Sequence, residues 1–251
     1  MAVLAAFFAA SQAAAATATP ADLYVAGQYQ AAIDAGSAQD NAQGYAIAAR
    51  AALAIAMLHE TPCLECLQRA ESLARASIAK DPKRADARVY LAAALGYQGR
   101  IIGMIQTRFK GYPSEAKSNL DAALAAEPND ARALAALGGW NIAIVTGGGA
   151  MLANMLYGAT LEKGLADFNA AFKRAPADIV LRYQYALSLS AYDRKKYRKN
   201  ILDALTYATN GNAASAYEQA MQKRAATLLA LLKSGDTEKY DTMVKRFQGY
   251  P

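Results

Sequence analysis

The residues best suited to chemistry lie in the segment TPCLEC, which runs from Thr61 to Cys66. Thr61 is a helix-capping residue type, and the following proline suits a first helical turn, which places Cys63 and Cys66 near a helix N-terminus. A thiolate is favoured there, so redox chemistry is one interpretation. Together with His59, the two thiols would supply three metal ligands, but a closed zinc site needs four. The motif therefore predicts a short disulfide that fixes a helix start, with redox or metal chemistry as the alternative.

No other cluster of residues in the sequence indicates catalysis. His59 is the only histidine, and no nucleophile, base and orienting residue can be assembled around it. Carboxylates such as Glu71, Asp121 and Asp167 are expected at exposed helix positions, and nothing marks a pair of general acid and general base. We therefore expect a non-enzymatic protein with no catalytic residue, no cofactor and no metal.

The glycine-rich segment TGGGA, from Thr146 to Ala150, resembles a phosphate-binding loop only superficially. It lacks the Gly-Lys-Ser/Thr ending of a phosphate loop and the strand that would precede it. Its glycines instead predict the end of one helix and the start of another, AMLANMLYGATL. The surrounding stretch, 133–161, has no charged side chain, but the glycines, Asn141 and Asn154 interrupt it. Because of these interruptions, we do not expect the stretch to cross a membrane or the protein to be an integral membrane protein.

Three segments align without gaps and define an internal repeat, residues 70–92, 116–138 and 164–186. Each has small residues at its first and eighth positions, an apolar residue at its ninth position and a proline at its thirteenth. The prolines are Pro82, Pro128 and Pro176. Small residues at helical spacing let antiparallel helices approach closely, and a proline ends one helix and suits the start of the next.

This pattern resembles the tetratricopeptide repeat, which has small residues on its second helix and a proline in the turn that follows. Leu137 and Gly138 lie where that family often has Leu-Gly, and GQYQAAI at 27–33 is similar to its Gly-x-Tyr-x-x-Ala element. The resemblance covers most of residues 21–208. It implies a right-handed α-solenoid of antiparallel helix pairs.

The alanine-rich composition also favours helix, because alanine loses the least conformational freedom on entering one. The sequence therefore predicts an all-α fold. We expect a single helical-repeat domain at 19–251, in which two capping helices complete the solenoid. The predicted repeats are 41–82, 85–128, 131–176 and 179–208, and the predicted caps occupy 213–248.

The repeats are longer than those of the family that they resemble. The prolines are 46 and 48 residues apart, whereas the standard repeat has about 34 residues. The additional residues lie at 97–113 and at about 138–164, and insertions at equivalent places emerge on one side of a solenoid. That side is the predicted ligand or partner face, represented by Ile101, Met104, Arg108, Trp140, Asn141, Met151, Asn154, Met155 and Tyr157.

The N-terminal segment MAVLAAFFAASQAAAATATP is apolar and then small and polar, with Ala-x-Ala sequences that end at Ala16 and Ala18. This is typical of a cleaved signal peptide, although a basic start is missing. We assign residues 1–18 to it and expect the mature protein in the periplasm.

These observations favour an exported adaptor that binds an unidentified periplasmic protein. The alternative is binding or transport of an apolar small molecule or lipid in a cavity lined by 97–113 and 138–164. That alternative is similar in architecture to the T component of TRAP-type transporters. Nucleic-acid binding is not expected, because the net charge of +6 is spread along the chain rather than gathered in a basic stripe.

Overall fold

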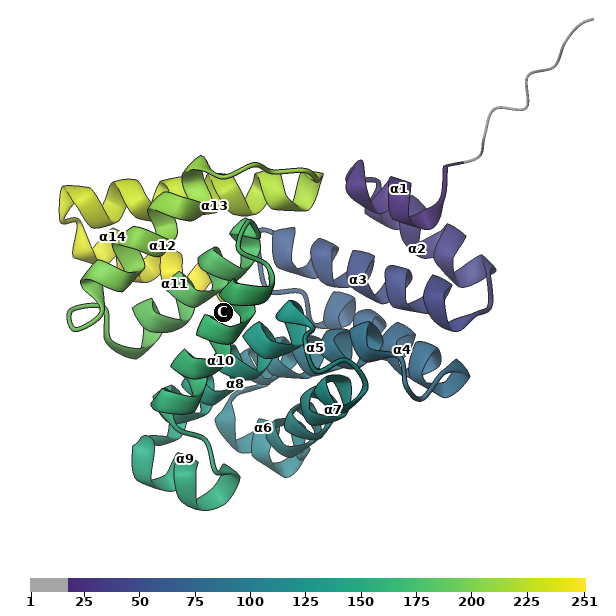
Figure 1. Ribbon diagram of the computed structural model, residues 1–251, viewed down its shortest axis with the longest axis horizontal. Coiled ribbons are helices and arrows are strands. Elements are labelled where there is room, and N and C mark those ends of the chain that lie inside the picture. The colour runs from purple at the N-terminus through teal and green to yellow at the C-terminus, as the bar shows by residue number, and fades with distance from the viewer. Residues whose placement is uncertain (1–17) are drawn as a thin grey trace, which may run out of the picture.

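The computed structural model describes residues 18–251 and confirms the predicted all-α class. Of the predicted signal peptide, residues 1–17 lie outside the described part of the chain. The described residues form fourteen helices and no strand (Figure 1). The helices are α1 (Pro20–Val25), α2 (Tyr29–Ala38), α3 (Ala42–Leu58), α4 (Leu64–Lys80), α5 (Ala85–Ile102), α6 (Met104–Phe109), α7 (Tyr112–Ala126), α8 (Ala131–Gly148), α9 (Ala150–Tyr157), α10 (Leu161–Arg174), α11 (Ile179–Asp193), α12 (Arg198–Asn210), α13 (Ala216–Ser234) and α14 (Thr237–Phe247).

The helices pack as successive pairs, which makes the fold a helical-repeat architecture. The principal pairs are α3 with α4, α5 with α7, α8 with α10, and α11 with α12. The first helix of each pair also packs on the first helix of the next, as α5 does on α3 and α8, and α11 on α8. The pairs therefore form a curved row from α3 to α12 (Figure 1).

Small residues hold the two helices of each pair together. The predicted small positions, Ala70, Ser77, Ala116, Ala123, Gly164 and Ala171, are all buried. In the α8–α10 pair the helices approach so closely that a Cβ added at Gly164 would lie 2.7 Å from Ile142 Cγ1 and 3.0 Å from the Gly138 carbonyl oxygen. Such distances leave no room for a side chain, so glycine is required at this crossing.

The turns between pairs follow directly from their proline and aspartate residues. Residues that precede proline are restricted to extended backbone, which ends the helix before each turn. Asp130 then caps α8, because its Oδ1 accepts the N–H groups of Arg132 and Ala133 at 2.7 and 2.9 Å. Asp178 caps α11 in the same way. Each turn thus stops one helix and starts the next within a few residues.

The two insertions are short additional helices that begin at glycines. Helix α5 ends before Gly103, which has a φ of 85°, and α8 ends before Gly149, which has a φ of 75°. At both glycines the positive φ changes the direction of the chain. Helices α6 and α9 follow immediately. The predicted break at the glycine-rich segment is therefore confirmed, and its cause is a backbone conformation that favours glycine.

The C-terminal helices return toward the N-terminal half of the molecule. Helix α13 contacts α1, and Arg224 on α13 donates a hydrogen bond to the Met57 carbonyl oxygen at 2.8 Å. Arg100 on α5 donates to the carbonyl oxygen of Gln248 at 2.7 Å. Buried residues of α8 and of α10 to α14 form one core cluster, and those of α1 to α5 form another.

The uncharged stretch at 133–161 does not form one continuous helix. Gly149 divides it between α8 and α9. Within residues 18–251, no helix combines the length and the mean hydropathy that a membrane crossing requires.

Candidate functional site

The cysteine motif lies in the loop between α3 and α4. Cys63 and Cys66 form a disulfide, and Cys63 is the residue immediately before α4. Nδ1 of His59 lies 2.8 Å from the Thr61 carbonyl oxygen, so the imidazole is engaged by its own loop. Within the described residues, no group of three or more His, Cys, Asp or Glu side chains is arranged to hold a metal ion.

Five of the nine residues predicted for the partner face are exposed. Met104 and Arg108 lie on α6, and Met151, Asn154 and Met155 lie on α9. Met151 retains 80% of its accessible surface, which is unusual for a large apolar side chain in a packed repeat. The structure thus brings both insertions to the surface.

The other four predicted residues turn toward the protein. Ile101 and Tyr157 are half-buried against core residues, and Trp140 is half-buried with its Nε1 donating to the Pro113 carbonyl oxygen at 3.0 Å. Asn141 is buried and donates from Nδ2 to Asp167 Oδ2 at 3.0 Å. Burial raises the pKa of the Asp167 carboxyl. Trp140 therefore contacts the start of α7, and Asn141 joins α8 to α10.

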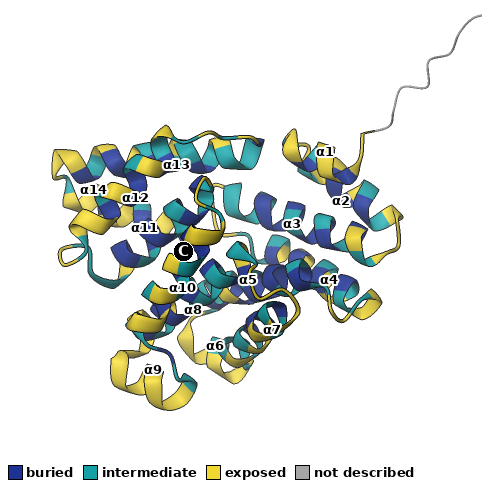
Figure 2. Ribbon diagram, in the orientation of Figure 1, coloured by how far each residue is buried: buried dark blue, intermediate teal, exposed yellow. Residues whose placement is uncertain are grey.

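The exposed side chains belong to a larger apolar patch. We define the apolar patch as Met104, Ile105 and Phe109 on α6 together with Met151, Leu152, Met155 and Leu156 on α9, all of which are exposed. Phe109 retains 90% of its accessible surface. Helices α6 and α9 are largely exposed along the lower edge of the molecule (Figure 2). The insertions therefore present these apolar side chains to solvent rather than around a closed cavity.

A second surface feature is an open groove along three successive turns between helix pairs. We call it the turn groove, and its volume is about 610 Å³. It is lined by Asp81, Lys83, Arg84, Asp86, Glu127, Asn129, Asp130, Ala131, Arg132, Arg174, Ala175 and Asp178. These residues come from equivalent places in three repeats, so the groove is a direct product of stacking.

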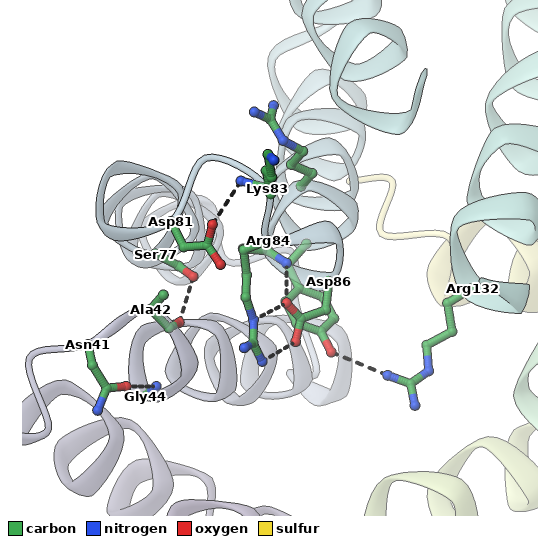
Figure 3. Close-up of polar contacts among 12 residues, drawn as sticks. Asn41, Ala42, Gly44, Ser77, Asp81, Lys83, Arg84, Asp86 and Arg132 are labelled. Atoms are coloured by element: carbon green, nitrogen blue, oxygen red, sulfur yellow. Dashed lines mark hydrogen bonds and ion pairs between the residues drawn. The ribbon is translucent and has the colours of Figure 1, made fainter. Parts of the chain in front are cut away.

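Part of the charge in the turn groove is held by local contacts. The Arg84 guanidinium contacts Asp86 through two hydrogen bonds of 2.7 and 3.1 Å (Figure 3). The hydrogen bond to Asp86 raises the pKa of Arg84. Arg132 Nη1 lies 3.4 Å from the Tyr90 hydroxyl oxygen, and burial raises the pKa of Tyr90. These contacts orient the guanidinium groups of Arg84 and Arg132.

Other charged side chains of the turn groove are free to contact a partner. Lys83, Glu127 and Arg174 are exposed and form no ion pair with another described residue. The groove thus offers charges of both signs at fixed spacing, an arrangement that selects a polar partner by charge pattern. From the sequence, these turns were predicted only to end one helix and begin the next. The available signal was the recurrence of charged residues around Pro82, Pro128 and Pro176.

Comparison with known proteins identifies the family. A protein-family model described as Regulator of microtubule dynamics protein 1-3 matches residues 22–233. A search of the curated proteins finds none that matches the chain.

This match corrects the resemblances expected from sequence. The assignment to the tetratricopeptide-repeat family, and the weaker one to the T component of TRAP-type transporters, are wrong, because the matching model is that of a different family. The misleading features were the small residues and turn prolines, which also suit closely packed antiparallel helix pairs outside that family. Because the matched residues cover most of its length, the chain belongs to the family Regulator of microtubule dynamics protein 1-3.

Proposed function

We propose that this protein is a non-enzymatic helical-repeat adaptor that binds a protein partner through the turn groove. The observation that carries the proposal is the groove itself, in which three stacked turns place Lys83, Glu127 and Arg174 on one open surface. Stacked repeats generally bind partners along such extended surfaces. The family description names the regulation of microtubule dynamics, an effect on a protein polymer, and this also supports protein binding.

The adaptor role without catalysis is supported by the contacts of the reactive side chains. The two cysteines are joined to each other, and the His59 ring contacts its own loop. The alternative role, transport of an apolar molecule in a cavity lined by the insertions, has less support. Met104, Phe109, Met151 and Met155 face solvent, so they enclose no such cavity.

Site-specific photo-crosslinking tests the turn groove. With benzoylphenylalanine at Lys83, Asn129 or Arg174, irradiation of cells of the native host is expected to yield a discrete covalent adduct with one protein. All three side chains are exposed, and none caps a helix or forms an ion pair with another described residue, so the substitutions preserve the fold. Gel mobility and mass spectrometry identify the adduct.

Matched control positions are Lys195 and Lys223, which are exposed and do not line the groove. Lys195 follows the end of α11 that is opposite to Asp178. No adduct is expected from either control, and the double substitution Lys83→Glu and Arg174→Glu is expected to remove the adduct formed from position 129. Equal adducts from groove and control positions, or none from the groove, would refute the proposal.

We also propose that the protein is exported to the periplasm after removal of residues 1–18. The disulfide between Cys63 and Cys66 supports an oxidising compartment. In a Gram-negative host, the mature protein is expected in the periplasmic fraction with Thr19 as its first residue, as measured by N-terminal sequencing. Recovery in the cytoplasm with an intact N-terminus would contradict export.

A further inference from the structure

The apolar patch is the most exposed apolar feature of the described chain, and the turn groove does not use it. Its side chains are methionine, isoleucine, leucine and phenylalanine on α6 and α9. Large apolar side chains that gather on a surface mark a site of interaction with another molecule or with a membrane. The chemistry around the patch indicates which of these covers it.

The two helices of the patch belong to one surface. Trp140 on α8 donates a hydrogen bond at 3.0 Å to the carbonyl oxygen of Pro113, in the first turn of α7, the helix that follows α6 and contacts it. The same indole ring packs edge-on against Tyr157 at the end of α9, with 6.2 Å between ring centroids. A single side chain therefore contacts both the start of α7, which follows the first insertion, and the end of α9. Figure 1 shows α6 and α9 along the same edge of the molecule.

Every charged residue of the insertion that contains α6 is positive. Between Arg100 and Pro113 the only charged residues are Arg100, Arg108 and Lys110, and 133–161 has none. Arg108 and Lys110 are exposed. A partner that complements this surface has an apolar interior and a negatively charged boundary. An anionic bilayer has both properties, since acyl chains lie directly beneath phosphate groups.

We propose that the apolar patch docks on an anionic lipid surface. Helices α6 and α9 enter the boundary between headgroups and acyl chains, as short amphipathic segments do. Arg108 and Lys110 contact the phosphates, and methionine side chains adapt to the fluid interface. Trp140 and Tyr157 lie at the level of the headgroups, where such amphipathic rings are enriched. This inference goes beyond the proposed function, because it assigns another surface to another class of partner.

Trp140 provides a direct measurement of docking because it is the only tryptophan of the chain. Vesicles of phosphatidylcholine and phosphatidylglycerol are expected to shift its fluorescence to the blue, and brominated acyl chains are expected to quench it. Vesicles of phosphatidylcholine alone are expected to bind much more weakly. This experiment uses the wild-type protein, so its result does not depend on how any variant folds.

Variants then assign the binding to the patch. Ile105→Ser with Phe109→Ser is expected to reduce co-flotation with the mixed vesicles about tenfold or more, because each change removes apolar surface from the bilayer boundary. The control is Val25→Ser, an exposed apolar residue on α1, which is expected to have no effect. Arg108→Glu with Lys110→Glu is expected to weaken binding to the same extent, whereas Lys195→Glu with Lys223→Glu leaves most of it.

Three results would overturn the proposal: absence of Trp140 quenching, equal loss in the patch and control variants, or equal binding to neutral vesicles. A photo-crosslink from position 109 to a protein, without vesicle binding, would assign the patch to a protein partner instead. Crosslinking from the turn groove is measured separately, so failure of the lipid proposal and failure of the adaptor proposal are distinguishable.

Discussion

Replacing Gly164 with valine is expected to lower the free energy of unfolding by about 3 kcal/mol, because the α8–α10 crossing has no room for a side chain. A Cβ at this position would approach Ile142 Cγ1 to 2.7 Å and the Gly138 carbonyl oxygen to 3.0 Å. The carbonyl belongs to the helix backbone and cannot move aside without displacing α8. Chemical denaturation followed by circular dichroism measures the loss.

Gly147 is the matched control on the same helix pair. It lies near the end of α8, and a Cβ built there meets no atom within 4 Å. Gly147→Ala is expected to leave the unfolding free energy unchanged or to raise it by up to about 1 kcal/mol, since alanine favours helix. If Gly164→Val were as stable as Gly147→Ala, close packing of α8 on α10 would not be what requires glycine.

The fold could be predicted from sequence because its main constraints are local. Small residues at a fixed register, such as Ala116, Ala123 and Ala171, indicated where helices approach, and all three are buried. Glycines at 147–149 predicted the break between two helices, and the chain turns there through a positive φ at Gly149. Each signal acts within a few residues, so sequence alone carries it.

Family membership could not be derived from the same signals. Proline turns and small residues report how closely helices pack, and unrelated helical-repeat families share that requirement. The longer spacing of Pro82, Pro128 and Pro176 was the departure from the tetratricopeptide pattern. This longer spacing indicated the insertions that form α6 and α9, but it did not identify the family.

The candidate surfaces depended on contacts between distant residues, which is why sequence predicted only part of them. Met104 and Met151 were expected on the partner face and are exposed, whereas Asn141 on the same list is buried against Asp167. The turn groove was missed because Lys83 and Arg174 come together only when the repeats stack. Helical periodicity describes a single helix and contains no information about that stacking.

The two surfaces lie at opposite ends of the same helices. Helix α5 begins beside Arg84 of the turn groove and ends at Gly103, where α6 starts. Helix α8 likewise begins beside Asp130 and ends at Gly149, where α9 starts. An 18-residue helix is roughly 27 Å long. A protein in the turn groove and a lipid surface at the apolar patch can therefore be bound at the same time.

Two phenylalanines separate the stability of the fold from the role of the patch. Phe168 is 1% exposed and packs on Tyr185 and Phe172, with ring centroids 5.1 and 6.0 Å apart. Phe168→Ala is expected to lower the unfolding free energy by about 3–5 kcal/mol, because it removes apolar contacts and leaves a cavity. Denaturant unfolding measures the change.

Phe109→Ala makes the same chemical change on α6, where the side chain is 90% exposed. Its unfolding free energy is expected to stay within about 0.5 kcal/mol of the wild type, while its binding to anionic vesicles falls. An exposed phenylalanine contributes little to folding, so lost vesicle binding with unchanged stability can arise only from its contact with the lipid. A stability loss at position 109 as large as that at position 168 would mean that the patch is part of the core and not a docking surface.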